Sequence, residues 1–323
     1  MTHSPAAAAV CRRHHNWGLA ILGAIGTLVL VGPLLTGDPT EVVDATGASL
    51  VAPLGQRWIF RMADGTTIAA EHAVSDRGGW WIDRRFERVW LPGDRVESSH
   101  QRRFWLGTDV LGRDVVARLL AGGRVSLLVG SMALTVALLI GVILGLAAGW
   151  TGGVVDAVLM RLVDGLLSIP LLFVLLLLGA VLRPSLTVLV VVLGSASWMG
   201  VARLTRGQVL SLKEREFVLA ARTMGASPLR IARVHLLPNA ATPITQDAAL
   251  RLGDLILVET SLSFLGFGVQ PPTPSWGAMV AEGQGVLGTG WWLTLFPGLA
   301  IAATVVAAAL AADSLTRPRT PSR

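Results

Sequence analysis

The charged side chains with the clearest potential for chemistry lie in an otherwise apolar stretch, residues 244–265. Asp247, Arg251 and Asp254 are spaced i, i+4 and i+7, so a helix would place them on one face. Charges at membrane depth are costly and either pair with one another or face a watery interior. Two interpretations stay open for Asp247 and Arg251: an ion pair near the cytoplasmic end, or part of a conduit. For Glu259, which has no opposite charge four residues away, we expect a place in the conduit.

The sequence lacks the familiar catalytic patterns. A phosphate-binding P-loop needs Gly-Lys-Ser/Thr, but Lys213 is the single lysine and stands between Leu212 and Glu214. HExxH and GxSxG are also absent. The histidines are scattered, and Cys11 is the single cysteine, which excludes an internal disulfide or a cysteine metal cluster. We expect a chain that is not an enzyme and holds no metal or cofactor.

The composition is that of a membrane protein. Hydrophobic residues make up 52% of the 323 residues, charged residues 15%, and the mean hydropathy is +0.61, whereas soluble domains carry about 25% charged residues. The net charge of +6 comes almost entirely from arginine. Such an excess in a membrane protein usually reports topology and contact with anionic lipid. We therefore expect lipid as a partner and no nucleic acid.

Apolar stretches predict six transmembrane helices, because about 20 apolar residues cross a hydrocarbon core of ~30 Å. The expected helices are residues 17–35, 125–150, 165–182, 185–202, 244–265 and 291–312. A signal peptide is the competing interpretation of the first, but the stretch is long for a signal and no clean cleavage site follows. Arginines in the expected inside segments predict that both tails, residues 1–16 and 314–323, are cytoplasmic.

Small residues indicate how these helices pack. Gly141, Gly145 and Gly149 recur every four residues, so one face of the second helix should let a neighbouring backbone come close. Residues 151–164 are expected to form a short loop, and Pro170 to kink the third helix.

Residues 36–105 differ from the rest and predict a small β-rich extracytoplasmic insert. Residues 57–62 read as a strand, Asp64-Gly65 as a tight turn and residues 66–68 as the return strand. Short strands are also expected at 80–82 and 89–91, with the aromatic side chains forming a small core.

The motif LGTDVLGRD follows the insert at residues 106–114. Its candidate functional residues are Gly107, Thr108, Asp109, Gly112, Arg113 and Asp114. Either Thr108 or Asp109 can cap a helix. The apolar residues after the motif share one face and Arg118 lies on the other, which is typical of an interfacial amphipathic helix within 106–124 that ends at Gly122-Gly123. The alternative, which the residues alone favour, is simply the capped start of a helix.

The cationic segment from residue 203 to 238 predicts two helices that meet at a corner. The first runs to Met224, and Gly225 ends it in a left-handed conformation. Ser227 caps the second helix and Pro228 occupies its first position, and this helix should stop before Pro238. A solvated loop on the positive inside would explain the arginines but not the Ala-Ala pair, the glycine and the Ser-Pro cap together.

This segment resembles the signature of the transmembrane permease subunits of binding-protein-dependent ABC importers. That signature is Glu-Ala-Ala, three residues, Gly, nine residues and Ile-x-Leu-Pro. The residues in register are Ala220, Ala221, Gly225, Leu237 and Pro238. Leu219 stands where the signature has Glu, and His235 where it has Ile.

The chain is more closely similar to one branch, the C-type subunits of dipeptide, oligopeptide and nickel permeases. The similar stretches are LGTDVLGRD, ARLTRGQVLSLKEREFV at 202–218 and LSFLGFGVQPPTPSWG at 262–277. The resemblance covers about residues 106–315 and leaves out the 36–105 insert. Phe104-Trp105 replaces the His-Pro expected before the motif.

The resemblance implies an all-α membrane protein with the type I ABC importer permease fold over residues 122–313, in a prokaryotic inner membrane. In this family the short helix after the glycine docks on a cytoplasmic ATPase and carries its motion into the membrane helices. The residues implied in coupling are Ala220, Ala221, Gly225, Ser227, Pro228, Leu229, Leu237 and Pro238. The implied partners are two ATPase subunits, a second homologous permease and an extracytoplasmic binding protein. The implied substrates are di- or oligopeptides, with nickel or glutathione as alternatives.

Two other classes of function remain as alternatives. An ion-coupled secondary transporter would use Asp247, Asp254 and Glu259 and should work alone in liposomes under an ion gradient. A membrane-anchored sensor or scaffold would act through the 36–105 insert, so that deleting the insert abolishes function. The missing inverted repeat argues against the first of these.

Overall fold

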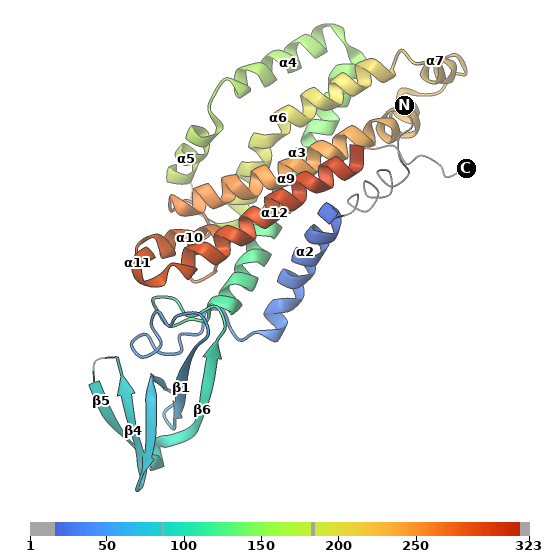
Figure 1. The fold of residues 1–323 in the computed structure, drawn as a ribbon. Helices are drawn as coiled ribbons and strands as arrows, with labels where there is room; N and C mark the ends of the chain where they lie inside the picture. Colours follow the sequence, from blue (N-terminus) through green and yellow to red (C-terminus); the bar gives the residue numbers. More distant parts are fainter. Residues whose placement is uncertain (1–16, 86, 182–184, 317–323) are drawn as a thin grey trace, which may run out of the picture. The chain divides into compact units, whose positions relative to one another are not determined.

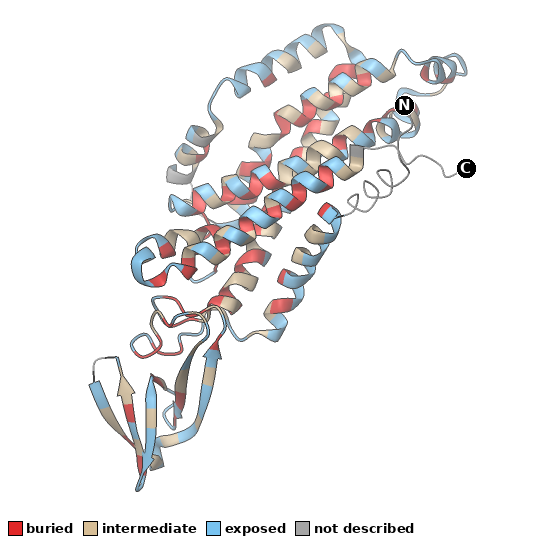
Figure 2. Cartoon of the chain, viewed as in Figure 1, coloured by how far each residue is buried: buried red, intermediate tan, exposed pale blue. Residues whose placement is uncertain are grey.

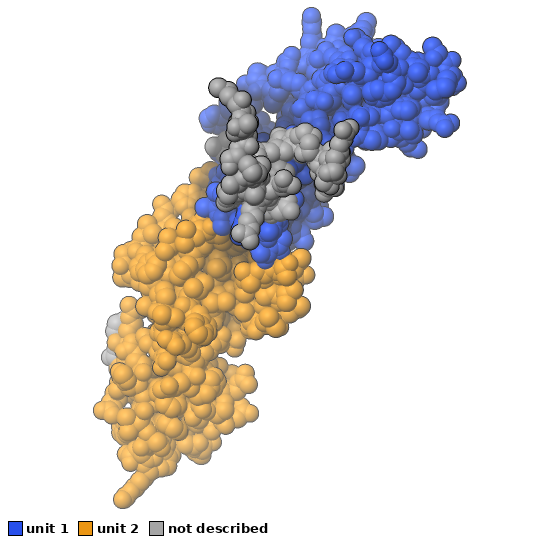
Figure 3. Space-filling model, turned by 45° about the vertical axis from the view of Figure 1, so that its right-hand side comes forward, with its two compact units in different colours: residues 1–25, 127–262, 301–323 blue, residues 26–126, 263–300 orange. Residues whose placement is uncertain are grey.

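The computed structural model describes residues 17–85, 87–181 and 185–316 and shows a mostly helical chain with two small β-sheets (Figure 1). The chain divides into two compact units (Figure 3). Unit 1 takes residues 1–25, 127–262 and 301–323, and unit 2 takes residues 26–126 and 263–300. The cytoplasmic location expected for the tails falls largely on residues 1–16 and 317–323, outside the described residues.

The two sheets belong to unit 2 and follow α2 (Trp17–Leu35) in the chain. The first sheet has the antiparallel order β2-β1-β6 and the second the order β3-β4-β5. The strands are β1 (Gly55–Met62), β2 (Thr67–Ala70), β3 (His72–Asp76), β4 (Gly79–Arg84), β5 (Glu87–Pro92) and β6 (Val96–Phe104). The strands expected at 57–62, 66–68, 80–82 and 89–91 are present as β1, β2, β4 and β5. The strands β3 and β6 were not predicted, because their residues are mostly polar and exposed.

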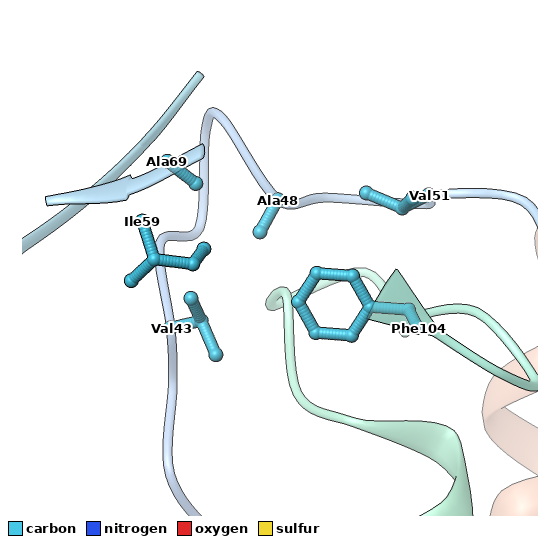
Figure 4. Packing of buried hydrophobic residues seen from close by; sticks show 6 residues of the cluster. All are labelled: Val43, Ala48, Val51, Ile59, Ala69 and Phe104. Carbon is cyan, nitrogen blue, oxygen red and sulfur yellow. The ribbon is translucent and has the colours of Figure 1, made fainter. Parts of the chain in front are cut away.

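Alternate side chains of β1 enter two separate apolar clusters, as the two-residue period of a strand requires. Ile59 joins a cluster of loop and strand residues shown in Figure 4: Val43, Ala48, Val51, Ile59, Ala69 and Phe104. Phe60 joins the other, where its ring centroid lies 5.4 Å from that of Trp80. The expected core of aromatic side chains is therefore present, but it forms only one of the two clusters.

Asp44 ties the loop before β1 to both sheets. Its carboxylate accepts hydrogen bonds from the backbone N–H groups of Ala69 and Thr46, at 2.9 and 2.8 Å, and from Arg84 Nη2 at 2.7 Å. Burial alone would raise the pKa of this carboxyl group, but the backbone hydrogen bonds and the Arg84 guanidinium together hold the pKa of Asp44 below its ordinary value.

Acid should weaken this junction. Because the folded-state pKa of Asp44 is lowered, its stabilising contribution is complete above the ordinary aspartate pKa of about 3.9 and is lost as the pH falls through the lower folded-state value. Asp44→Asn should destabilise the insert at neutral pH by roughly 1–3 kcal/mol, because several donors lose a charged acceptor. Amide hydrogen exchange of residues 43–104 in the full chain measures this. Glu97→Gln, at an exposed position on β6, is the control, and equal protection in Asp44→Asn and the parent would contradict the prediction.

The helices of the described chain differ in their bounds from the six expected stretches. They are α2, α3 (Val115–Thr151), α4 (Gly153–Leu167), α5 (Leu171–Val181), α6 (Leu186–Leu212), α7 (Glu216–Thr223), α8 (Pro228–Ile231), the π-helical turn η3 (Ala232–Leu236), α9 (Leu237–Phe264), α10 (Trp276–Gln284), α11 (Leu287–Gly290) and α12 (Trp292–Thr316). Within the described ranges, four helices are long and apolar enough to span a membrane: α2, α3, α6 and α12.

The third and fifth expected spans differ from the structure for separate reasons. Residues 151–164 were expected as a loop, but α4 begins at Gly153, and the chain leaves helical structure before Pro170 and resumes it in α5. Proline cannot donate the backbone hydrogen bond that a continuous helix needs, so the expected kink is a break between two helices. The helix α9 has 28 residues and is long enough, but its charged side chains keep it below the apolar character of the other four.

The glycines of α3 form the close helix contact that their spacing predicted. A Cβ atom at Gly145 would lie 2.5 Å from the carbonyl oxygen of Ala202, and one at Gly141 would lie 2.8 Å from that of Trp198. A Cβ atom at Gly149 would lie 2.7 Å from the Cβ atom of Val209. These contacts set α3 and α6 backbone to backbone within unit 1.

The prediction of a separate interfacial helix that ends at Gly122-Gly123 is wrong, whereas the alternative, a capped helix start after the motif, is confirmed. The helix α3 starts at Val115 and continues through both glycines to Thr151. Its first turn is capped by Asp114, whose Oδ1 accepts from the N–H of Val116 at 2.8 Å, and neither Thr108 nor Asp109 takes this place. The glycines remain helical because their missing side chains make room for Trp276 and the backbone of Ser275, both in unit 2.

Candidate functional site

The first candidate site is a knob formed by residues 213–238 of unit 1, and its corner is Gly225. The glycine has φ +77°, the left-handed conformation that its position predicted. The N–H of Ala226 donates to the carbonyl of Ala221 at 3.0 Å and that of Gly225 to Arg222 at 2.9 Å, which closes the end of α7. Ser227 Oγ then accepts from the N–H of Arg230 at 3.4 Å, so the predicted N-cap of α8 is present.

The knob has its own apolar core and an exposed outer face. Ala221, Val218, Ile231 and Leu236 are buried together with Val209 of α6. The exposed residues of the predicted coupling set are Ala220, Gly225, Ser227, Pro228, Leu229 and Pro238. The two alanines thus differ in role, because one packs inside the knob and the other faces outward.

Two boundaries of the knob differ from the prediction. The first helix does not run unbroken to Met224, because α6 ends at Leu212 and α7 starts at Glu216. The second helix does not stop before Pro238, because α8 continues through η3 into α9 and Pro238 falls in the first turn of α9. The π-helical turn η3 directly precedes Pro238, and such a bulge in a helix accommodates the backbone N–H that proline lacks.

Contacts with the end of α3 anchor the knob. The guanidinium of Arg222 lies 4.2 Å from the ring centroid of Trp150, a cation–π contact. Lys213 Nζ donates to the carbonyl oxygen of Gly149 at 3.2 Å. Both contacts tie the knob to α3, which also packs along α6.

Two arginines of α6 at the base of the knob form ion pairs, although the sequence suggested that they face solvent. Arg206 pairs with Asp156 through two nitrogens, one of them Nη2 at 2.6 Å from Oδ2, and Arg203 pairs with Asp164. Both carboxylates belong to α4, so these ion pairs join α4 to α6. Leu219, at the position where the resembled signature has Glu, is exposed on α7, and Glu216 one turn earlier is exposed as well.

The charged residues of α9 separate into three environments. Asp247 and Arg251 form an ion pair through Oδ2 and Nε, as one of the two interpretations expected. Asp254 is exposed, and among the described residues it has no ion pair. Glu259 is fully buried within the chain.

The motif at 106–114 is a compact loop whose side chains bond to their surroundings inside unit 2. Gly107 and Gly112 take φ values of +83° and +77°, and both approach backbone atoms that a Cβ would strike. Thr108 is fully buried, accepts from the N–H of Val51 at 2.8 Å, and its carbonyl oxygen accepts from Trp292 Nε1 at 3.0 Å. Asp114 accepts from Arg102 Nη2 at 3.1 Å.

A largely buried ion cluster of four residues gathers at this motif, and we call it the Asp109 cluster: Asp109, Arg113, Arg118 and Glu282. Asp109 Oδ2 accepts from Arg113 Nε at 2.6 Å and from Arg118 Nη1. Glu282 of α10 receives Arg118 through both oxygens, at 2.6 and 2.9 Å. Two positive and two negative side chains therefore balance one another, with Asp109 and Arg118 almost fully buried and Glu282 33% exposed.

Arg118 was expected on the polar face of an interfacial helix, and no role was predicted for Glu282. In the structure the side chain of Arg118 is 3% exposed. A partial signal was available, because Glu282 is the single charged residue between residues 266 and 312. Its partner, however, lies 164 residues away in the chain.

Comparison with known proteins places the chain in a family. The family described as "Binding-protein-dependent transport system inner membrane component" matches residues 141–318. The DppC dipeptide permease of Bacillus subtilis is 43% identical over 212 residues, which cover 65% of this chain and 66% of that protein. The DppC di/tripeptide permease of Pseudomonas aeruginosa is 40% identical over 226 residues, or 70% and 73% of the two chains. The OppC oligopeptide permease of Escherichia coli is 44% identical over 202 residues, or 62% and 66%.

A solved structure supports the fold. The inward-facing MetNI methionine ABC transporter has a chain that matches with a TM-score of 0.51 and 23% identity, over 62% of this chain and 96% of that one. The chain belongs to the family of inner-membrane components of binding-protein-dependent transport systems. Its similarity spans about two thirds of the length of the relatives.

Proposed function

We propose that this chain is a permease subunit of an ATP-binding-cassette importer for di- or oligopeptides. It supplies half of the pathway, a second homologous permease supplies the other half, and two cytoplasmic ATPase subunits drive both. An extracytoplasmic binding protein delivers the substrate. The relatives, which are named as dipeptide, di/tripeptide and oligopeptide permeases, support the peptide class.

The observation that carries this proposal is the knob. Its Gly225 corner, capped α8 and closed apolar core hold Ser227, Pro228 and Leu229 exposed on one short helix. A helix presented in this way fits a groove of another protein, and the sequence has no nucleotide-binding motif of its own. The proposal therefore assigns ATP hydrolysis to the partner and its transmission to the knob.

The proposed topology has six crossings with both termini in the cytoplasm and the 36–105 insert outside. The four apolar helices α2, α3, α6 and α12 supply four crossings. We assign the other two to α9 and to the α4–α5 pair. Exposed apolar side chains support a lipid- or protein-facing place for that pair, among them Val158 and Leu162 of α4 and Phe173 and Leu177 of α5. Figure 2 shows that much of α4 is exposed.

Reconstitution tests the proposed function. The tagged chain, purified from its native membrane in mild detergent, should co-purify with an ATPase and a second permease. By itself it should show no transport driven by an ion gradient. The complex in liposomes should accumulate labelled dipeptide only with ATP and the binding protein. Uptake by the chain alone under an ion gradient would instead favour a secondary transporter, in which Asp247, Asp254 and Glu259 carry the coupling. Accumulation of a nickel chelate or glutathione in place of peptides would change the substrate and leave the coupling intact.

A further inference from the structure

Unit 1 contains a cavity of about 300 Å³ beside the charged face of α9. Its walls are mostly apolar and include Leu167 of α4, Leu171 of α5, Met199 of α6 and Leu255 of α9. Two charged side chains, Arg251 and Asp254, also line it. Small-molecule sites are typically apolar cavities of about 300–1,000 Å³ with a few placed polar groups, and this one is at the small end of that range.

The guanidinium of Arg251 is held in place from three sides. Its Nε donates to Asp247, and its Nη1 lies 3.5 Å from the carbonyl oxygen of Ser197. It also lies against Gly200, where a Cβ atom would come within 2.2 Å of Nη2 and 3.0 Å of Cζ. Gly200 thus provides the space that the guanidinium fills, and the described contacts leave part of its five N–H donors for another acceptor.

Asp254 gives the cavity its net charge. Arg251 is balanced by Asp247, and in the described part of the chain Asp254 has no cationic partner. The cavity therefore carries one excess negative charge beside a set of N–H donors. Residues three apart on a helix have Cβ atoms ~5–6 Å apart, so a ligand that reaches both must present a cation and an acceptor within about one residue's length.

We propose that this cavity is a subsite for the amino-terminal end of a short peptide on its way through the membrane. The α-ammonium group binds Asp254, and the first carbonyl oxygen accepts from the Nη atoms of Arg251. The apolar walls take the first side chain. This inference rests on the proposed function and adds a recognition site within the permease, separate from the binding protein.

Direct binding tests the subsite without the binding protein. The purified permease–ATPase complex in nanodiscs is equilibrated with labelled alanyl-alanine or N-acetyl-alanyl-alanine, and bound label is measured by equilibrium dialysis. The parent should bind the free dipeptide at least about tenfold more tightly than the acetylated one, because a charge-assisted hydrogen bond is lost. Asp254→Asn should remove this preference.

Gly200→Ala provides a second variant that changes no charge. The added methyl group should displace the guanidinium of Arg251 and weaken dipeptide binding about tenfold. Gly207→Ala on the same helix is the matched control, because a Cβ there meets no atom within 4 Å, and it should bind as the parent does.

Three results would each overturn the subsite. The parent complex binds neither peptide, it binds both peptides equally, or Asp254→Asn keeps the parent's preference for the free dipeptide. ATP-driven uptake by the same preparations, assayed with the binding protein added, tests the proposed function separately. If uptake proceeds while these binding results fail, only the subsite is wrong. If no peptide is taken up with every partner present, the proposed function itself is wrong.

Discussion

Arg118→Met should lower the free energy of unfolding by about 3–5 kcal/mol, the cost of removing one partner from a buried ion pair. Arg118 joins Asp109 of the motif to Glu282 of α10, and its side chain is almost completely buried. Without it, Arg113 alone must balance two carboxylates. The measurement is thermal unfolding of the detergent-solubilised protein, followed by tryptophan fluorescence.

Two further variants make this expectation specific. Arg124→Met removes an exposed arginine of the same helix and should leave the unfolding temperature close to that of the parent. Adding Glu282→Gln to Arg118→Met should recover part of the loss, because it removes the excess carboxylate. An Arg118→Met protein that unfolds at the same temperature as Arg124→Met would show that the Asp109 cluster does not stabilise the fold.

Gly225→Val should reduce ATP-driven peptide uptake by about tenfold or more, although the chain still inserts in the membrane. Gly225 has φ +77°, a conformation that costs roughly 1–2 kcal/mol per L-residue and more for a β-branched one. A valine there should shift the corner and with it the exposed α8 helix. Uptake into proteoliposomes that contain the proposed partners measures the effect, with complex recovery as a check on assembly.

Gly225→Asn is the matched control at the same position. Asparagine adopts the left-handed conformation far more readily than valine, and a Cβ at residue 225 meets no atom within 4 Å in this chain. The asparagine variant should therefore retain most of the uptake. If asparagine and valine impair uptake equally, the surface at the corner matters and its backbone conformation does not.

Much of the knob was predictable because its signals are local. The left-handed Gly225, the Ser227 cap and the first-position Pro228 each depend on residues within about one turn, and each is found as predicted. The continuation of the chain through Pro238 was not predictable in the same way. A proline after an apolar stretch commonly ends a helix, but here helical structure continues through η3 and past Pro238 into α9.

Among the glycines of α3, the role of one group was predicted correctly from the sequence and that of the other was not. The spacing of Gly141, Gly145 and Gly149 correctly indicated a helix face open to close approach, and the structure identifies α6 as the neighbour. The pair Gly122-Gly123 was read as a helix end, yet the helix continues. The cost of glycine in a helix is offset there by packing against Trp276, a residue far away in the chain.

By itself, the sequence determined the membrane character, the β-hairpin at Asp64-Gly65, the corner at Gly225 and the register of the coupling signature, because each follows from composition or from neighbours in the chain. Only the tertiary structure decided which charges meet. Arg118 with Glu282, Arg206 with Asp156 and Asp44 with Arg84 are pairs separated by 40 to 164 residues. A buried charge is stable only where folding delivers its counter-charge, and no spacing within one segment specifies that partner.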